Sequence, residues 1–252
     1  MRLDALVNRL DKLGQAIRSR RLLQALFRHR VLAGAEHRNV LSCDLKTVVD
    51  VGANRGQFAL AARRWAPGAR VVSFEPLSGP AGIFRGVFSG DEQVILHQSA
   101  IGPVSAMQTM HVSARDDSSS LLPISSLQTA MFRGTGEVAT TEVRVATLDE
   151  FVGADDLQAP AMLKLDVQGF ELDALRGCES LLRHFDRVYC ECSFVEFYSG
   201  QKLAGEVVDW LAARGFSLVG KFNPAFDSRG QVVQADFLFE RKSDSVGLRA
   251  LP

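Results

Sequence analysis

Glycine and acidic residues stand where two apolar runs of this chain end. The run Val48–Val51 leads into Gly52-Ala53-Asn54-Arg55-Gly56, and Glu75 closes the apolar run that follows. Glycines let a backbone turn tightly and come close to a ligand. A carboxylate at the end of the second strand of such a unit can accept hydrogen bonds from both hydroxyls of a ribose. The spacing therefore predicts a binding site for a cofactor that contains a ribose.

The same loop distinguishes between two kinds of cofactor. Its glycines do not follow the Gly-x-Gly-x-x-Gly spacing typical of dinucleotide sites, because Ala53 and Asn54 come directly after Gly52. The loop also begins with an acid, Asp50, which suits a cofactor that carries an ammonium group and would repel a pyrophosphate. These details favour S-adenosylmethionine over NAD, although the general pattern fits both.

Further acids predict where the second substrate binds. Asp166 follows the apolar run 162–165, and ligands of α/β proteins bind beyond the carboxyl ends of such strands. Asp166 is therefore the first candidate for a general base or a ligand of the substrate, with a helix cap as its structural alternative. Glu191 and His97 are the next candidates for the base. Asp166 and Glu191 together suggest a divalent cation, but two carboxylates are a thin ligand set and we assign no metal site.

Alternating strand and helix patterns after residue 40 predict the scaffold that positions these residues. Helices are expected at 56–66, 169–182 and 203–214. Strands are expected at 47–51, 70–74, 93–97, 162–165, 187–192, 217–222 and 235–241. Such alternation indicates an α/β fold with a mostly parallel seven-stranded sheet, and the last two strands form an antiparallel C-terminal hairpin. The stretch 99–147 interrupts the alternation and contains two further strands, at 107–112 and 141–145, on either side of a polar loop at 115–120.

The N-terminal residues differ from the rest of the chain. Lys and Arg total 29 across 252 residues, as do Asp and Glu, so net charge gives no reason to expect a nucleic-acid partner. Residues 1–40, however, are rich in arginine, and residues 1–30 show helical spacing of apolar side chains. We expect this helix to pack on the domain or on a second copy of the chain, with an anionic membrane surface as the alternative. The predicted organisation is an extension at 1–40, a domain at 41–243 and a tail at 244–252.

The four cysteines indicate the compartment. No apolar run reaches the length of a membrane span, and nothing at the N-terminus resembles a signal peptide. Cys43, Cys178, Cys190 and Cys192 are therefore expected to be thiols in a reducing compartment. A cytoplasmic protein is predicted, with peripheral membrane contact as the alternative.

Motifs in a fixed order resemble one known family. They are Asp50–Gly56, Phe74-Glu75-Pro76, Ser118–Leu121, Thr147–Phe151, Leu163–Glu171 and Glu191–Phe194 with Tyr198. In this combination the chain resembles the FkbM-type methyltransferases from about residue 47 to 240. The resemblance implies a Rossmann-like class I methyltransferase fold, S-adenosylmethionine as methyl donor, and in-line transfer to a hydroxyl of a sugar, glycolipid or secondary metabolite. A carboxylate or histidine would act as the base.

The resemblance also implies which residues hold the cofactor. Gly52, Asn54 and Gly56 would line its methionine end, and Asp50 would face its amino group. Glu75 would bind the ribose, and the adenine would lie beside Ser99 and Ala100. Asp166 would stand between the cofactor and the acceptor.

Two other functions stay open at this level. The first is an NAD-dependent oxidoreductase, against which the loop beginning at Asp50 argues. The second is a non-catalytic, membrane-associated protein that keeps a cofactor fold. Nucleic-acid methylation is disfavoured because no Asn/Asp-Pro-Pro-Tyr type of motif follows the fourth strand. The expected partner is a small-molecule or glycan acceptor.

Overall fold

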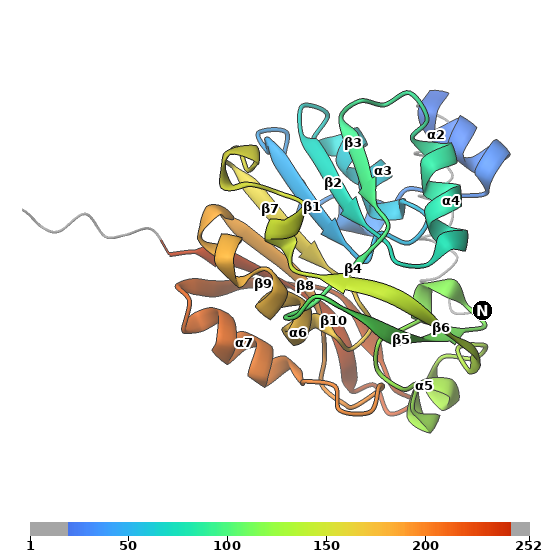
Figure 1. Ribbon diagram of the computed structural model, residues 1–252. Coiled ribbons are helices and arrows are strands. Elements are labelled where there is room, and N and C mark those ends of the chain that lie inside the picture. The colour runs from blue at the N-terminus through green and yellow to red at the C-terminus, as the bar shows by residue number, and fades with distance from the viewer. Residues whose placement is uncertain (1–19, 243–252) are drawn as a thin grey trace, which may run out of the picture.

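The computed structural model describes residues 20–242 and is built on a seven-stranded sheet (Figure 1). The strand order is β3-β2-β1-β7-β8-β10-β9. Strands β3, β2, β1, β7 and β8 run parallel, whereas β10 is antiparallel to both β8 and β9. The predicted fold class is confirmed. The strands are β1 Thr47–Val51, β2 Arg70–Phe74, β3 Val94–His97, β7 Ala161–Leu165, β8 Arg187–Ser193, β9 Phe216–Phe226 and β10 Val232–Arg241.

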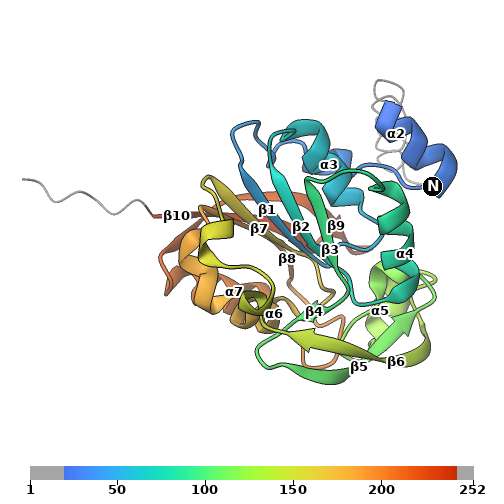
Figure 2. The ribbon, with the colours of Figure 1, turned by 45° about the horizontal axis from the view of Figure 1, so that its top comes forward.

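Helices cover both faces of this sheet, which explains why its central strands are apolar throughout (Figure 2). One face packs on α3 (Gln57–Trp65) and α4 (Ser78–Val87), and the other packs on α6 (Glu171–Gly177) and α7 (Ala204–Ala212). Every residue of β1 and β7 is buried. The buried strands leave their carboxyl ends as the place where polar side chains gather.

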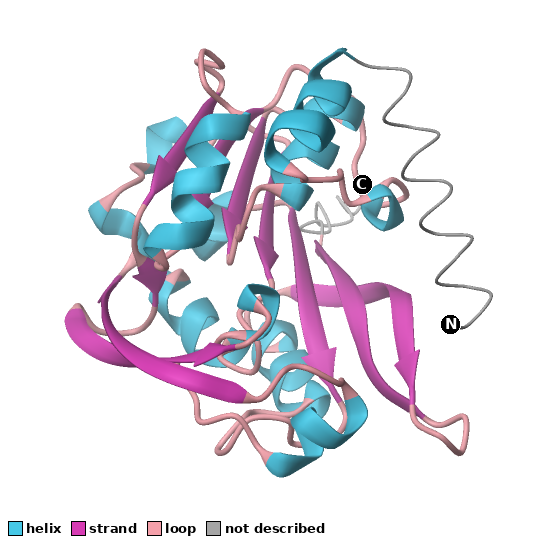
Figure 3. Cartoon of the chain, turned by 90° about the vertical axis from the view of Figure 1, so that its right-hand side faces the viewer, coloured by secondary structure: helices cyan, strands magenta, loops and turns pink. Residues whose placement is uncertain are grey.

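A smaller sheet interrupts the alternation, as the sequence predicts. It contains β4 (Ala100–Ile101), β5 (Ala106–Ser113) and β6 (Glu137–Ala146) in the order β4-β6-β5, and α5 (Ser126–Met131) lies between its long strands in the chain. Strands β5 and β6 form a long antiparallel ribbon that lies beside the main sheet (Figure 3). Both are longer than predicted.

The N-terminal segment packs on the α3 face. It contains α2 (Arg20–Gln24), a π-helical turn (Ala25–His29) and a 3₁₀ turn (Ala35–His37). Leu22, Ala25, Val31 and Val40 are buried in the same cluster as α3, so this part of the segment is a structural piece of the domain. The first 19 residues of the helix expected over 1–30 and the predicted tail at 244–252 lie outside the described residues. Within residues 20–242, no helix has the length and hydropathy needed to span a bilayer.

One predicted helix begins late and breaks. The spacing predicts a helix over 169–182, but α6 starts at Glu171 and ends at Gly177, and a separate 3₁₀ helix covers Glu179–His184. Gln168 and Gly169 have φ values of 55° and 95°, in the left-handed region, so a right-handed helix cannot include them. The remaining 3₁₀ turns are Asp116–Ser118, Leu148–Glu150 and Ala154–Asp156.

Candidate functional site

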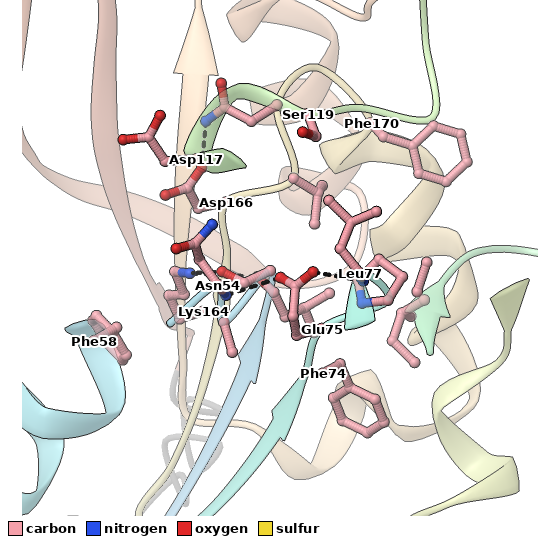
Figure 4. Close-up of a pocket in the computed structure, with 18 of the residues that line it drawn as sticks. Asn54, Phe58, Phe74, Glu75, Leu77, Asp117, Ser119, Lys164, Asp166 and Phe170 are labelled. Atoms are coloured by element: carbon pink, nitrogen blue, oxygen red, sulfur yellow. Dashed lines mark hydrogen bonds between the residues drawn. The ribbon is translucent and has the colours of Figure 1, made fainter. Parts of the chain in front are cut away.

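A cavity of about 300 Å³ opens at the carboxyl ends of β1, β2 and β7 (Figure 4). The loops that follow these three strands form its floor. The small sheet and residues 116–121 contribute one wall, and residues 36–37 with Phe58 of α3 contribute another. Ligand sites of doubly wound folds lie at this edge of the sheet, and this volume is at the small end of the usual range for ligand pockets.

Gly52 brings the loop after β1 into contact with the loop after β7. Its φ is 79°, and a Cβ placed on it would lie 1.8 Å from the backbone oxygen of Asp166. Only glycine fits such a position. The next turn is also unusual, because Asn54 has a φ of 46°. Gly52 and Asn54 both line the cavity, as the sequence predicts.

Glu75 presents a carboxylate inside the cavity (Figure 4). Its Oε2 accepts a hydrogen bond from the backbone N–H of Asn54 at 2.9 Å, and its Oε1 accepts one from Leu77 at 2.8 Å. The side chain is buried, and this burial raises the pKa of Glu75 to about 7 despite the two amide donors. The carboxylate therefore needs further donors in order to be fully ionised at neutral pH.

Asp50 forms an ion pair with a lysine of β7. It is fully buried beneath the cavity, and its Oδ1 lies 2.9 Å from Nζ of Lys164. Lys164 also donates a hydrogen bond to the backbone oxygen of Gly52 at 2.9 Å. Burial lowers the pKa of Lys164, but Asp50 and Asp166 raise it further, so the amine keeps its charge. The pair fixes the glycine loop to β7, and Lys164 rather than Asp50 reaches the cavity lining.

A glutamine side chain joins the two carboxylates that the sequence places at the acceptor end. Gln168 Nε2 donates to Asp166 Oδ1 at 2.7 Å and to Glu191 Oε2 at 3.1 Å. Its Oε1 accepts a hydrogen bond from Tyr198 Oη at 2.7 Å, which orients the amide. Burial, with Asp166 and Asp236 nearby, raises the pKa of Glu191 well above its usual range. Asp166 lines the cavity, but Glu191 does not.

The Gln168 amide occupies the space in which a divalent cation would bind between Asp166 and Glu191. Its nitrogen donates a hydrogen bond to each of the two carboxylates. In the part of the chain that the structure describes, no three His, Cys, Asp or Glu side chains are grouped so as to hold a metal ion.

Glu171 shapes the loop that carries Asp166. Its Oε1 accepts hydrogen bonds from the backbone N–H groups of Val167 and Gly169, each at 3.1 Å. Burial raises the pKa of Glu171 to about 7. Since α6 begins at Glu171 with Phe170 as its N-cap, Asp166 is not the cap of this helix. The structural alternative for Asp166 is therefore wrong, and its carboxylate is left to face the cavity.

Three further predicted positions lie around the cavity in different ways. Ala100 lines it, whereas the neighbouring Ser99 is buried and donates its Oγ–H toward backbone oxygens of Ala100 and Arg144. Gly56 has a φ of 95° and packs on Phe88, behind the glycine loop. Ser99 and Gly56 thus support the cavity wall without reaching its surface.

His97 points away from the cavity. Its ring lies 5.2 Å from the ring of Phe74 and 4.8 Å from that of Phe151, measured between centroids. Burial lowers the pKa of His97. His97 ends β3, as the sequence predicts, but its ring belongs to an aromatic cluster and does not line the cavity.

Sequence reasoning missed several side chains of this cavity. His37 lies in it although it comes before the first strand, outside every motif quoted above. Asp116 comes from the polar loop predicted at 115–120, but no role is predicted for its carboxylate. It lines the cavity, and its Oδ2 lies 2.7 Å from Nη2 of Arg55, which connects this loop to the glycine loop. Gln168 was visible inside a motif, but nothing in the sequence assigned it a bridging role.

Known proteins are similar in sequence to most of this chain. Residues 50–218 match the family model described as "Methyltransferase FkbM domain". The chain is 27% identical over 200 residues to 2-O-methyltransferase NoeI of Sinorhizobium fredii, covering 74% of this chain and 79% of that protein. It is 26% identical over 206 residues to 31-O-demethyl-FK506 methyltransferase FkbM of Streptomyces tacrolimicus, covering 71% and 75%. Among solved structures, magnesium protoporphyrin IX methyltransferase of Synechocystis aligns with a TM-score of 0.42 at 13% identity, covering 79% of this chain and 72% of that one.

Proposed function

The chain belongs to the FkbM methyltransferase domain family, and on that premise we propose that it transfers a methyl group from S-adenosylmethionine to a hydroxyl group. One observation carries the proposal. The glycine loop, an acid at the end of β2 and an acid at the end of β7 meet in a single cavity, although they lie far apart in the sequence. Membership of a methyltransferase family decides against the oxidoreductase alternative.

The residues of the cavity fit the proposed methyl donor. Glu75 offers a buried carboxylate that lacks enough donors, and the two hydroxyls of a ribose would supply them. Gly52 and Asn54 line the cavity where the methionine portion would lie, and a side chain at residue 52 would meet the backbone of Asp166 and push the two loops apart. Ala100 and Leu77 line the part of the cavity beyond Glu75, where an adenine ring would pack. The roles of Gly56, Ser99 and Asp50 would be indirect, through the walls of the cavity.

The remaining lining groups suit a hydroxyl acceptor. The cofactor supplies an electrophilic methyl group, so the protein must align the acceptor oxygen and remove its proton. Asp166 is the one predicted acceptor-side carboxylate that reaches the cavity, and it can accept a hydrogen bond from the acceptor hydroxyl. Alignment of the two reactants contributes roughly 7–11 kcal/mol at best, and a general base adds about 10²–10⁴-fold.

The acceptor class follows from the relatives. The names of NoeI and FkbM describe O-methylation, in the second case on FK506. We therefore infer a hydroxyl of a sugar, glycolipid or secondary metabolite. Contact of the arginine-rich N-terminal segment with a membrane or a second copy stays a prediction, as does the division of the chain at residue 40.

The proposed function predicts a specific pattern of ligand stabilisation. S-adenosylmethionine and S-adenosylhomocysteine should raise the melting temperature, because a ligand that binds only the folded state stabilises it. NAD should have no effect. Extracts of cells with and without the gene, compared by mass spectrometry, should then differ by one methyl group on an oxygen. A melting temperature that responds to NAD and to neither sulfur nucleoside would overturn the proposal.

Glu75 gives the cofactor affinity a dependence on pH. The pKa of Glu75 is about 7 in the free protein, and the ribose hydroxyls prefer the ionised carboxylate. Below pH 7 the dissociation constant of S-adenosylhomocysteine should therefore rise by up to about tenfold per pH unit, and above pH 8 it should level off. Titration calorimetry at pH 6, 7 and 8 measures this. The Glu75→Gln variant should bind more weakly with a flat profile, and a sloping profile in that variant would assign the proton to another group.

A further inference from the structure

Ionisable side chains form a row on one face of the sheet, at its carboxyl edge. Lys164 of β7 pairs in register with Tyr189 of β8, and Glu191 of β8 pairs with Asp236 of β10. Alternate residues of a strand share a face, so Tyr189 and Glu191 point to the same side. His37 covers this row, since its ring lies 5.6 Å from the ring of Tyr189. His37, which lies outside the family match, thus lines the cavity beside this row.

Hydrogen bonds along the row fix the proton positions of His37. Tyr189 Oη donates to Asp236 Oδ2 at 2.7 Å, and Asn223 Nδ2 donates to the same Oδ2, also at 2.7 Å. Burial and Asp236 raise the pKa of Tyr189 far above neutrality, so its hydroxyl keeps its single proton. Because that proton is donated to Asp236, Tyr189 Oη acts as an acceptor, for Nδ2 of Asn223 at 3.2 Å and for Nδ1 of His37 at 3.1 Å. The imidazole therefore carries its proton on Nδ1 and a lone pair on Nε2.

The surroundings of Nε2 suit the uptake of a proton. This nitrogen lies 3.9 Å from Oε1 of Glu36, too far for a hydrogen bond but close enough to stabilise a positive charge. Burial lowers the pKa of His37, and Lys164 lowers it further, while Asp236, Glu36 and Asp166 raise it. The net direction is downward, so the ring is neutral at pH 7 and able to accept a proton.

Resting on the proposed function, we propose that His37 is the general base of the methyl transfer. The acceptor oxygen forms a bond to the methyl carbon while the sulfur–methyl bond breaks and its electron pair returns to sulfur. The hydroxyl proton passes to Nε2 of His37 and later to water. Tyr189 and Asp236 are positioning residues, which hold the ring in the tautomer that can accept this proton.

Asp166 and His37 would have different roles toward the acceptor hydroxyl. One oxygen of Asp166 already accepts a hydrogen bond from the Gln168 amide, which fixes the carboxylate in place. Asp166 is therefore better suited to orient the hydroxyl, and His37 to take its proton. Both side chains line the same cavity.

The tautomer can be measured without any acceptor. Nitrogen-15 NMR of protein labelled at histidine should show the signal of His37 with its proton on Nδ1 at pH 8. The assignment comes from the His37→Asn variant, in which that signal disappears. In Tyr189→Phe the Nδ1 tautomer should no longer dominate, because its acceptor is gone. A ring protonated on Nε2 in the wild type would overturn the proposal.

The catalytic role needs a second set of variants. His37→Asn keeps a donor toward Tyr189 but lacks the base, and His184→Asn is the control, since His184 precedes β8 at the opposite edge of the sheet. With methyl hexopyranosides as probe acceptors, kcat of His37→Asn should fall at least about 100-fold. The decrease of kcat toward low pH, the acid limb of the wild-type profile, should be absent from this variant. The affinity for S-adenosylhomocysteine should change less than about threefold. A kcat within about threefold of wild type would overturn the proposal. Failure of the wild type to bind S-adenosylhomocysteine would instead refute the proposed function, and the tautomer measurement would still stand on its own.

Discussion

Replacing Gly52 with alanine is expected to lower the free energy of unfolding by at least about 4 kcal/mol, a loss in the exceptional range for one substitution. Two causes add. The φ of 79° costs an L residue roughly 1–2 kcal/mol, and the new Cβ would lie 1.8 Å from the backbone oxygen of Asp166. Backbone cannot rotate away as a side chain does, so the two loops must separate. Urea unfolding followed by circular dichroism measures the change.

A second glycine provides the matched control. Gly82 stands inside α4, is exposed, and has no atom within 4 Å of where a Cβ would be. Gly82→Ala should therefore stabilise the protein by about 0.5–1 kcal/mol, through the reduced freedom of the unfolded chain. If Gly52→Ala lowered the free energy of unfolding by less than about 1 kcal/mol, this result would contradict the contact between the glycine loop and Asp166.

Short apolar runs in the sequence explain why the strands of the sheet could be predicted. Parallel strands that are buried on both faces are short apolar runs, and β1, β2 and β7 are bounded by glycine, proline or acid in the sequence. Local rules failed where the backbone takes a left-handed turn on a residue other than glycine. Gln168, at a φ of 55°, delays α6, and no residue type signals this.

Strand ends could be predicted, but the direction in which their side chains point could not. Asp166, Glu191 and His97 all lie at or near the carboxyl edge, as expected, yet only Asp166 reaches the cavity. His97 is turned toward the ring of Phe151, which lies more than 50 residues later in the chain. Which of several acids faces a ligand thus depends on packing between distant segments.

His37 illustrates the same limit more strongly. It lies in a short 3₁₀ turn without a motif, and its partners Tyr189 and Asp236 come from the far end of the chain. Its contact with Phe58 places it over α3. Only the folded sheet brings these residues together, and a sequence signal would have required knowing which strands are neighbours.

Asp166→Asn is expected to lower kcat by about 10- to 150-fold, the range for losing a hydrogen bond to a charged group worth about 1.5–3 kcal/mol. Asparagine keeps the shape, and its oxygen can still accept from Gln168 Nε2, so the loop and the fold should be preserved. The dissociation constant of S-adenosylhomocysteine should change little, because the lost interaction is with the acceptor. Asp173→Asn, in the following helix, is the control and should leave kcat unchanged, since Asp173 pairs with Arg176 outside the cavity.

Two additional measurements separate the roles that Asp166 could have. EDTA should leave wild-type turnover unchanged, because the Gln168 amide stands between Asp166 and Glu191, and inactivation by the chelator would restore the metal hypothesis. Asp166→Asn should retain the acid limb of the pH profile, whereas His37→Asn should lose it, because only the histidine takes up the proton. An Asp166→Asn variant with wild-type kcat would remove this carboxylate from the acceptor site and leave His37 to bind and deprotonate the hydroxyl without it.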